Sequence, residues 1–452
     1  MTLKKKVLIV AYLFPPIGGG GVQRALKMAK YLQEFGWEPH VLTVEPQYHV
    51  SLDQSLLEQL PTGVHVHRSK ELSLGAPPAA TAARAGESQS GHEGSPGLVT
   101  RLKKLVFPTL KKLKKYMLVP DDQILWLPYA MKKGLQVIND HQIDVIFSTS
   151  GPYTNHLVGL YLKRKTGTPW IADFRDPWTQ NMHRTDIAWR EWLEDRLERM
   201  VLRESDILLT VTRSFADNFK QKFSEELRRV EVIHNGFDPE DYKELQEVRG
   251  DDPSICSFIY TGIFYKERNP RLFLRAVKEL LDEGMLEREK VCLKFAGVFD
   301  YPGYSENMDC VKELGLEDLV HVLGHLPHQQ ALMELKKSDV LLLVGDTAPD
   351  SGDYIPGKLF EYMAIDKPIL ALSLKGESTQ IIENYALGEV VDPGNLAEIK
   401  AGILSLYRQW LEPAEAANVS ERPSTLIYER KEQARLLGKL LDEVYVEGVP
   451  KA

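Results

Sequence analysis

The chain has 452 residues, of which 43% are hydrophobic and 27% charged, and its formal net charge is −8. This composition is typical of a soluble globular enzyme and excludes a fibrous or largely disordered chain. The length predicts two or three domains, and the acidic balance argues against general nucleic-acid binding.

The cysteines and the apolar runs set further limits. Cys256, Cys292 and Cys310 are odd in number and form no CxxC pair, so neither a disulfide framework nor a zinc site is predicted. A reducing cytoplasm is the expected location. The start, MTLKKKVLIVAYLF, imitates a signal peptide but leads into Pro15, Pro16 and four glycines, so we interpret it as a buried strand. No apolar run reaches the roughly 18 residues of a membrane-spanning helix, so any membrane contact is expected to be peripheral.

Apolar strands alternate with helices in the first half of the chain. A helix is predicted over 22–35, where apolar residues recur at helical spacing. The other expected elements are strands at 7–14, 40–44, 144–148, 170–174, 207–211 and 230–233, a glycine loop at 18–21 and a helix at 156–165. This alternation predicts a parallel sheet with helices on both faces.

Two segments of this half do not fit the alternation. Residues 73–97 lack aromatic residues and any apolar period, which predicts a disordered loop. Residues 101–120, RLKKLVFPTLKKLKKYMLVP, interleave lysines with apolar residues. This pattern fits either a basic amphipathic segment on anionic lipid or a solvated basic helix packed on the first domain.

The alternation restarts after a polar connection at 242–253. The expected elements are strands at 257–261, 291–296, 320–323, 340–344 and 368–372, a helix at 270–281 and a last amphipathic helix at 425–444. We therefore predict an N-terminal domain over 1–238, a C-terminal domain over 239–423 and a terminal helical part over 424–452.

The segment SGDYIPGKLFEYMAIDKPILAL carries the most informative pattern. Pro356 and Gly357 act as a turn, so a helix is expected to begin near Lys358, with free N–H groups that suit a diphosphate. Glu361, one turn inside, can accept both hydroxyls of a ribose, and Asp353, on the preceding loop, can reach the sugar beyond the phosphates. The alternative is a surface helix with ordinary solvated acids.

The Asp353 and Glu361 pair resembles the E-x7-E signature of retaining GT-B glycosyltransferases of family 4, with Asp in place of the first Glu. The resemblance spans nearly the whole chain. It implies an α/β fold of two Rossmann-like, doubly wound parallel-sheet domains that face a cleft, the first on the acceptor side and the second binding the nucleotide sugar. It also implies a final helix that packs back on the first domain.

The glycine loop PPIGGGG contains Gly19, Gly20 and Gly21. A dinucleotide fingerprint has its first glycine directly after the strand, whereas here two prolines intervene, which predicts a wider loop. Its backbone amides can approach a ligand in the cleft, and it resembles the glycine-rich first loop of family 4. The alternative is a merely flexible turn.

The segment IYTGIFYKERNP resembles the family's strand and loop that carry an Arg after a Gly and then a Lys, both directed at the diphosphate. Gly262 is present and Arg268 fills the Lys position, but Ile263 stands where the Arg is expected. A departing diphosphate needs its negative charge neutralised, so Arg268 and Lys358 are assigned that role, with Asp353 as the third catalytic residue. The alternative for Arg268 is a solvated loop charge.

Further positions are assigned by the same resemblance. Gly297 and the run Gly324, His325 and Leu326 would frame the nucleobase. His325 and His328 have no third ligand and no nearby acidic cluster, so no metal is predicted.

Acceptor-side residues are expected where strands of the first domain end. Asp173 and Arg175 follow one strand, and His156 lies after another. Asp173 stands roughly where many family members have a histidine. The alternative is a loop salt bridge of Arg175 with Asp176 or Asp173.

The resemblance implies transfer of a sugar from a nucleoside diphosphate sugar to an acceptor hydroxyl, with retention, without a metal or other cofactor. Cell-surface polysaccharide or glycolipid synthesis is the expected setting. The partners would be the nucleotide sugar and a polysaccharide, glycolipid or lipid-linked acceptor, with peripheral contact to the inner face of an anionic membrane and no nucleic acid. The alternatives are a nucleotide-sugar epimerase or glycogen-synthase-like enzyme on the same fold, or a catalytically silent nucleotide-sugar-binding assembly protein, which the lost Arg at Ile263 keeps open.

Overall fold

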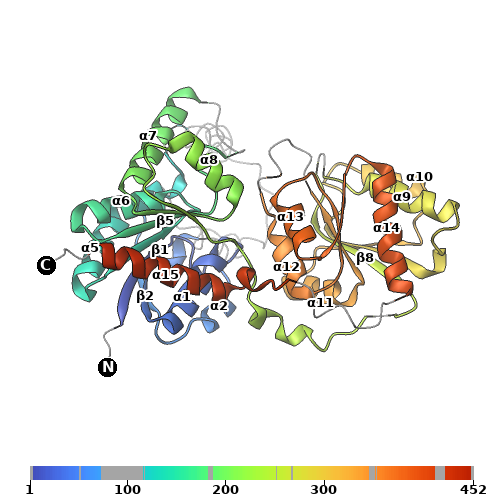
Figure 1. Cartoon of the computed structure of the whole chain (residues 1–452), viewed down its shortest axis with the longest axis horizontal. Helices are drawn as coiled ribbons and strands as arrows, with labels where there is room; N and C mark the ends of the chain where they lie inside the picture. The colour runs from blue at the N-terminus through green and yellow to red at the C-terminus, as the bar shows by residue number, and fades with distance from the viewer. Residues whose placement is uncertain are drawn as a thin grey trace, which may run out of the picture. The chain divides into compact units, whose positions relative to one another are not determined.

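The computed structural model describes residues 4–49, 52–72, 116, 118–181, 187–250, 252–265, 268–345, 352, 354–412 and 423–448. Asp353, the segment 73–97 and nearly all of the basic segment 101–120 lie outside these residues. The chain divides into two compact units, one formed by Met1–His234 with Arg430–Ala452 and the other by Asn235–Glu429 (Figure 1). The first unit thus ends at His234, before the predicted boundary at 238, and includes the terminal helix.

The first unit contains a seven-stranded parallel sheet in the order β3-β2-β1-β4-β5-β6-β7 among the described residues. Val7, Leu8, Ile9 and Val10 are fully buried because helices cover both faces of the sheet. The strands are β1 (Lys5–Val10), β2 (Trp37–Val44), β3 (His65–Ser69), β4 (Val145–Thr149), β5 (Trp170–Phe174), β6 (Ile207–Thr210) and β7 (Val230–Val232).

Helices of this unit connect the parallel strands, and the last helix of the chain returns to it. They are α1 (Val22–Leu32), α2 (Ser55–Glu58), α5 (Leu127–His141), α6 (Thr154–Thr166), α7 (Ala188–Glu204), α8 (Arg213–Phe223) and α15 (Arg430–Gly448). Helix α15 packs along α1 (Figure 1). A Cβ at Gly438 would lie 3.3 Å from Phe35 Cβ, so glycine permits this close approach. Trp37 Nε1 donates to Asp442 Oδ1 at 3.0 Å and ties the helix to β2.

The second unit contains a six-stranded parallel sheet in the order β10-β9-β8-β11-β12-β13 among the described residues. Its strands are β8 (Cys256–Ile263), β9 (Val291–Val298), β10 (Val320–Gly324), β11 (Val340–Val344), β12 (Ile369–Leu372) and β13 (Gly388–Val391). Its helices are α9 (Arg271–Asp282), α10 (Glu306–Glu313), α11 (His328–Lys337), α12 (Gly357–Ile365), α13 (Glu377–Asn384) and α14 (Leu396–Leu411).

Two apolar clusters hold this second sheet, one on each face. Alternate residues of one strand enter different clusters: Phe258 and Tyr260 pack toward α9, α10 and α14, whereas Ile259 packs toward α11, α12 and α13 (Figure 1). Burial on both faces explains why the strands are nearly continuous apolar runs rather than alternating ones.

Some predicted boundaries are wrong. The strand predicted over 7–14 ends at Val10, and the turn in which the Ile17 N–H donates to the Phe14 carbonyl follows four residues later. The helix predicted to begin at 425 begins at Arg430, after the 3-10 turn Leu426–Tyr428. The strands β3 and β13 were not predicted, because partly exposed edge strands carry polar residues.

Each sheet reverses its strand order at one point, which in open α/β sheets is where ligands bind, beyond the carboxyl ends of the strands. In the first unit this point lies between β1 and β4, and in the second between β8 and β11. The glycine loop follows β1, and the loop that carries Arg268 follows β8. The topology therefore places the two predicted ligand loops at the expected positions.

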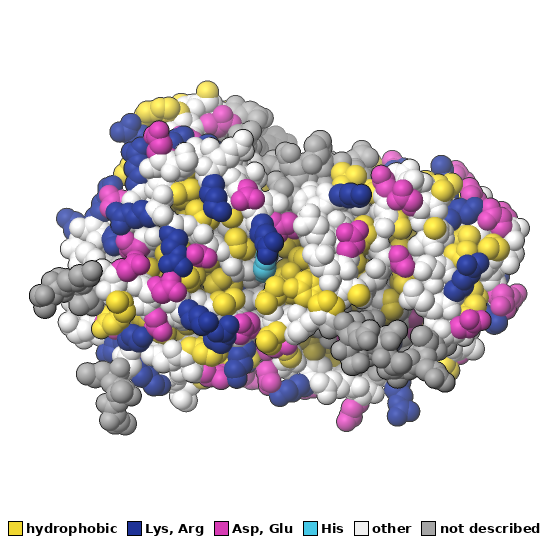
Figure 2. All heavy atoms as spheres, viewed as in Figure 1, with side chains coloured by type: hydrophobic (Ala, Val, Ile, Leu, Met, Phe, Trp, Pro, Cys, Tyr) yellow, Lys and Arg dark blue, Asp and Glu magenta, His cyan; other side chains and the backbone are white. Residues whose placement is uncertain are grey.

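Two further observations concern the charged side chains of the surface and the apolar character of the helices. On the face shown in Figure 2, Lys and Arg side chains are interspersed with Asp and Glu rather than gathered in one basic area. Within the described residues, no helix combines the length and the apolar character that crossing a bilayer requires.

Candidate active site

Gly262, near the end of β8, lies against the side chain of Lys358, the second residue of α12. Gly262 has φ +137°, and a Cβ on it would lie 2.0 Å from Lys358 Nζ, so only glycine leaves room for the ammonium group. Gly297, paired with Gly262 on β9, is equally constrained, because its Cβ would lie 2.1 Å from the Gly262 carbonyl oxygen. Gly262 thus leaves space for Lys358 Nζ, and Gly297 leaves space for the backbone of Gly262 beside it.

Tyr260 contacts Lys358 through both its ring and its hydroxyl. Lys358 Nζ lies 4.3 Å from the centre of the Tyr260 ring and donates to its hydroxyl at 3.3 Å. Burial, and next the charge of Arg268, lower the pKa of Lys358 to about 8. Burial raises the pKa of Tyr260 to about 12, so the phenol stays neutral. The positive charges of Lys358 and Arg268 repel each other, so a bound anion would stabilise both.

Arg268 is held by a short hairpin. The backbones of Tyr265 and Arg268 exchange two N–H···O bonds of 3.0 Å, and the guanidinium lies 5.1 Å from the Tyr265 ring centre. Its charge acts on both Lys358 and Tyr260. The charges of Arg268 and Lys358 therefore interact, whereas Ile263 is 46% exposed and supplies no charge.

Helix α12 places Glu361 one turn beyond Lys358. The helix is anchored by the Tyr362 hydroxyl, which donates to the Leu342 carbonyl at 3.0 Å. Burial raises the pKa of Glu361, and the charges of His328 and Lys358 partly oppose this shift. No described side chain caps the helix start at Gly357, so its N–H groups remain available to an anion.

The predicted nucleobase loop follows β10. Gly324 has φ +68°, and a Cβ on it would meet nothing within 4 Å, so the backbone turns in open space. His325 is exposed and Leu326 is partly buried. The loop can approach a planar ligand, but no contact identifies a base.

The glycine loop of the first unit is open, and Arg175 lies beside it. Gly19 and Gly20 are exposed, and a Cβ on either would meet nothing within 4 Å. A Cβ on Gly21 would lie 3.5 Å from Arg175 Nη1, and one on Gly151 would lie 2.8 Å from Nη2. Arg175 pairs with Asp176 at 3.2 Å, which is one of the two ion pairs considered from the sequence. Its guanidinium thus lies between two loops that follow β1 and β4.

Asp173 is not an accessible acceptor-side residue. It is fully buried and accepts hydrogen bonds of 2.8 and 2.9 Å from Arg24, as well as one of 2.7 Å from Thr149. Arg24 in turn donates to the carbonyls of Ile233 and His234. The carboxylate therefore fastens α1 and the end of β7 to the sheet, and the prediction of a ligand contact is wrong.

His156 is also a core residue rather than a cleft residue. It is fully buried in α6, where its ring stacks on Phe174 at 4.2 Å and its Nδ1 lies 2.8 Å from Ser148 Oγ. Burial lowers the pKa of His156 to about 3, against the opposing charge of Asp173, so the ring is neutral. Sequence spacing does not reveal that α6 begins at Thr154 and turns this side chain inward.

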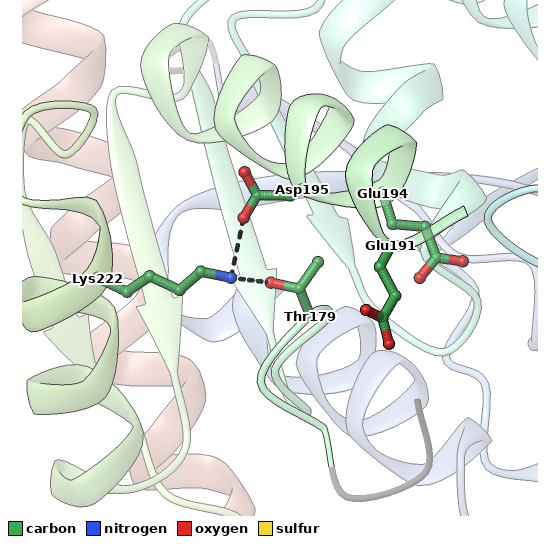
Figure 3. A pocket seen from close by; sticks show the side chains of 5 residues that line it. All are labelled: Thr179, Glu191, Glu194, Asp195 and Lys222. Atoms are coloured by element: carbon green, nitrogen blue, oxygen red, sulfur yellow. Dashed lines mark hydrogen bonds and ion pairs between the residues drawn. The ribbon is translucent and has the colours of Figure 1, made fainter. Parts of the chain in front are cut away.

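A separate polar cavity of about 210 Å³ lies in the first unit (Figure 3). Lys222 donates to Thr179 Oγ1 at 2.6 Å and pairs with Asp195 at 3.0 Å, while Glu191 and Glu194 complete the lining. None of the predicted site residues lines this cavity. Lys222 pairs with Asp195 and Glu194 pairs with Arg190, and we assign no ligand to the cavity.

Two family models match the chain in succession. Residues 19–236 match the Glycosyl transferase 4-like domain, and residues 245–422 match Glycosyl transferases group 1. The chain belongs to the GT-B glycosyltransferases. A probable glycosyltransferase of Pseudomonas aeruginosa, WbjE, is 25% identical over 255 residues, which make up 54% of this chain. The match spans 61% of the length of that relative.

Solved structures of this glycosyltransferase fold align with nearly the whole chain. A glycosyltransferase from Rickettsia africae ESF-5 is 13% identical with a TM-score of 0.59, covering 99% of this chain and 100% of the other. Anabaena HepE in complex with UDP is 14% identical with a TM-score of 0.55, covering 98% of each. The UDP-GlcNAc 2-epimerase of Methanocaldococcus jannaschii is 14% identical with a TM-score of 0.52, covering 97% of this chain and 99% of the other. At these identities the likeness is one of fold.

Sequence reasoning missed two residues that act on Lys358 and Glu361. Tyr260 lies under Lys358, and its signal was its place just before Gly262 on an apolar strand, where a tyrosine needs a partner for its hydroxyl. His328 was interpreted as a polar loop residue rather than a metal ligand, whereas its charge acts on Glu361. Asp353 lies outside the described residues, so its assigned role stays a prediction.

Proposed function

We propose that the enzyme transfers a sugar from a nucleoside diphosphate sugar to an acceptor hydroxyl, with retention at the anomeric carbon. The observation that carries the proposal is Lys358, which lies against Gly262 at the start of α12 and on which the charge of Arg268 acts. A diphosphate is the ligand chemistry that this arrangement suits, because it brings two adjacent negative groups to two cations and a helix N-terminus.

Each residue then has one task in the reaction. Glu361 accepts hydrogen bonds from the ribose hydroxyls and orients the donor. As the bond between the anomeric carbon and the diphosphate oxygen breaks, Arg268 and Lys358 stabilise the charge that develops on the leaving phosphate. The acceptor oxygen bonds to the anomeric carbon on the same face, and its proton passes to an oxygen of the departing diphosphate. This route uses no protein nucleophile, and Asp353 is proposed to contact the donor sugar.

The proposed reaction needs no metal ion, because the protein itself supplies the cations. Turnover that persists at full rate in chelator supports this account, and turnover restored only by a divalent ion overturns it. Retention is read separately from the anomeric configuration of the product by NMR spectroscopy.

A nucleotide-sugar epimerase is the second candidate, because the Methanocaldococcus jannaschii epimerase shares the fold. A thermal-shift panel of UDP-, GDP- and ADP-sugars, followed by mass spectrometry of products, separates the candidates. A glycosylated acceptor with free nucleoside diphosphate supports the transferase. An isomerised sugar without an acceptor supports the epimerase, and binding without any product supports a silent binding protein.

We also propose that the enzyme works at the cytoplasmic face of a membrane, where a lipid-linked or polysaccharide acceptor would lie. The six lysines Lys103, Lys104, Lys111, Lys112, Lys114 and Lys115 motivate it, although they lie outside the described residues. Flotation with anionic vesicles tests it. Equal recovery of the wild type and a variant with all six changed to Gln would contradict membrane binding.

Replacing Glu361 by Ala is expected to weaken nucleoside diphosphate binding at least tenfold. A charged acceptor that holds two hydroxyls is worth about 1.5 to 3 kcal/mol. Titration calorimetry measures the affinity, with Glu383→Ala on the exposed face of α13 as the matched control. If Glu361→Ala binds as tightly as the control while its circular dichroism is unchanged, Glu361 does not contact the donor.

The pH dependence of kcat/KM for the donor is expected to show a falling limb near pH 8. Burial lowers the pKa of Lys358 to about 8, so the free enzyme carries the ammonium charge below this pH and loses it above. Lys358→Arg should keep its remaining activity across this limb, because a guanidinium stays charged. The control is Lys312→Arg on the exposed surface of α10. A limb that is the same in all three proteins would assign it to another group.

A further inference from the structure

A cluster of four histidines lies at the edge of the first unit's sheet, apart from the loops described above. His40 comes from β2, His65 and His67 from β3, and His141 from the last residue of α5. In the parallel register His40 pairs with His65, and His67 is two residues further along the same strand, so these side chains share one face. Helix α5 packs on β2 and β3 and brings His141 to that face.

The nitrogen atoms of three of these rings converge. One nitrogen from each of His40, His67 and His141 lies within 4.8 Å of the others. His40 Nδ1 and His67 Nε2 are 3.0 Å apart. Two imidazole nitrogens bound to one tetrahedral zinc, each at about 2.0 to 2.1 Å, are roughly 3.3 Å apart. The observed spacing is therefore within a small side-chain shift of a coordinated one.

Glu38 fixes the orientation of the central ring. Its Oε1 lies 3.0 Å from His40 Nε2, and this carboxylate oxygen is an acceptor only, so Nε2 carries the proton. His40 Nδ1 then presents its lone pair toward His67 and His141. A carboxylate that accepts the far N–H of a ligating histidine is the usual outer partner in zinc sites.

We propose that His40, His67 and His141 form a binding site for a divalent transition-metal ion of the Zn²⁺ class, with Glu38 as the outer partner that orients His40. Three imidazoles and an open fourth position suit zinc and its neighbours among the late first-row metals rather than Mg²⁺ or Ca²⁺, which prefer oxygen.

The electrostatics of the cluster agree with this geometry. Burial, and the charges of the neighbouring histidines, lower the pKa of His40 and of His67 to about 4, so both rings are neutral near pH 7. A metal ion then requires the proton of His67 to move to its other ring nitrogen, with no net release of protons from the two rings. The charges of Lys6, which acts on Glu38, and Lys133, which acts on His67, oppose a bound cation. We therefore expect affinity in the micromolar range rather than that of a zinc finger.

The position of the cluster indicates a stabilising rather than a catalytic role. Strands β2 and β3 end at Val44 and Ser69, and the ligand crevice lies beyond those carboxyl ends. His40 and His65 lie before them, toward the amino ends. A metal here links α5 to the edge strand β3 and to its neighbour β2, so its loss should lower the melting temperature while leaving donor binding in the second unit unchanged.

Titration of chelator-treated full-length protein with Zn²⁺, followed by calorimetry, tests the site. We expect one ion per chain and a zinc-dependent rise in melting temperature. His67→Gln and His141→Gln should each weaken binding at least tenfold, and Glu38→Gln by about 10- to 100-fold. His321→Gln, an exposed histidine of β10, is the matched control and should bind like the wild type.

The outcomes are distinct. Absence of saturable binding by the wild type, or equal zinc binding by the His67→Gln/His141→Gln variant and the control, overturns the proposal, the latter placing the ion elsewhere, for example at Cys292. If the variants fail to fold, NMR of the ring nitrogens in the wild type decides. Zinc should then shift His40 Nδ1 while Nε2 stays protonated, and unchanged ring shifts would mean that the cluster is only a stack of neutral imidazoles.

Discussion

Replacing Lys358 with alanine is expected to lower kcat by about 100- to 1,000-fold, the range found when one preorganised donor to a developing oxyanion is removed. Lys358 Nζ is held in a space that Gly262 leaves open and is supported by the Tyr260 hydroxyl. The ammonium group is therefore positioned before the substrate arrives. Because negative charge grows on the leaving phosphate as the bond breaks, the loss should fall on kcat more than on the affinity for the nucleoside diphosphate.

Single-turnover kinetics with the preferred donor measure this effect, and Lys312→Ala on the surface of α10 is the control. Arg268→Ala is expected to behave in the same way, and the double variant to lose less than the product of the two single losses, since both cations act on one diphosphate. Turnover that survives both changes would show that the charge is neutralised by other groups. A loss confined to KM would make the pair a binding element only.

Much of the fold could be predicted from the sequence because buried parallel strands are apolar on both faces. The runs that became β5 and β11 were predicted at their observed bounds, 170–174 and 340–344. The strand β3, HVHRS, was missed because an edge strand with three half-exposed or exposed polar residues has no such signal. Helix starts were less accurate, since a 3-10 turn such as Leu426–Tyr428 reads as helix in composition.

The candidate site was predictable where local sequence determines geometry. Pro356 and Gly357 mark the start of α12, and this start places Lys358 and Glu361 one turn apart on the same helix. The histidines His40, His67 and His141 were not recognised, because only the strand register and the packing of α5 bring them together. Contacts of this kind depend on tertiary structure, which neither spacing nor periodicity encodes.

The same limit explains the two wrong acceptor-side predictions. Asp173 and His156 stand in or next to loops that follow strands, where ligand-binding residues are common. Burial decides between a ligand contact and a structural role, and both side chains are fully buried. Arg175, only two residues beyond Asp173, keeps part of its guanidinium exposed beside Gly21 and Gly151. Among these three residues, it is the one whose position suits an acceptor or a phosphate.

Replacing Asp173 with alanine is expected to destabilise the first unit by about 3 to 5 kcal/mol, the cost of leaving a buried charge without its partner. Arg24, 2% exposed, would then lose the carboxylate that accepts two of its hydrogen bonds, at 2.8 and 2.9 Å, while its bonds to the Ile233 and His234 carbonyls remain. Urea unfolding followed by tryptophan fluorescence measures the loss, since Trp170 lies on the same strand.

Arg175→Ala is the matched control for this experiment, because Arg175 lies just after β5, two residues from Asp173, and its loss also removes half of an ion pair. The Arg175 and Asp176 side chains are 22% and 39% exposed, so water replaces the lost partner and the expected cost is below about 1 kcal/mol. Adding Arg24→Met to Asp173→Ala should recover part of the stability, since it removes the buried charge that Asp173 had balanced. If Asp173→Ala is as stable as Arg175→Ala but loses acceptor binding, the buried pair is not what holds α1 to the sheet, and Asp173 returns as a ligand contact.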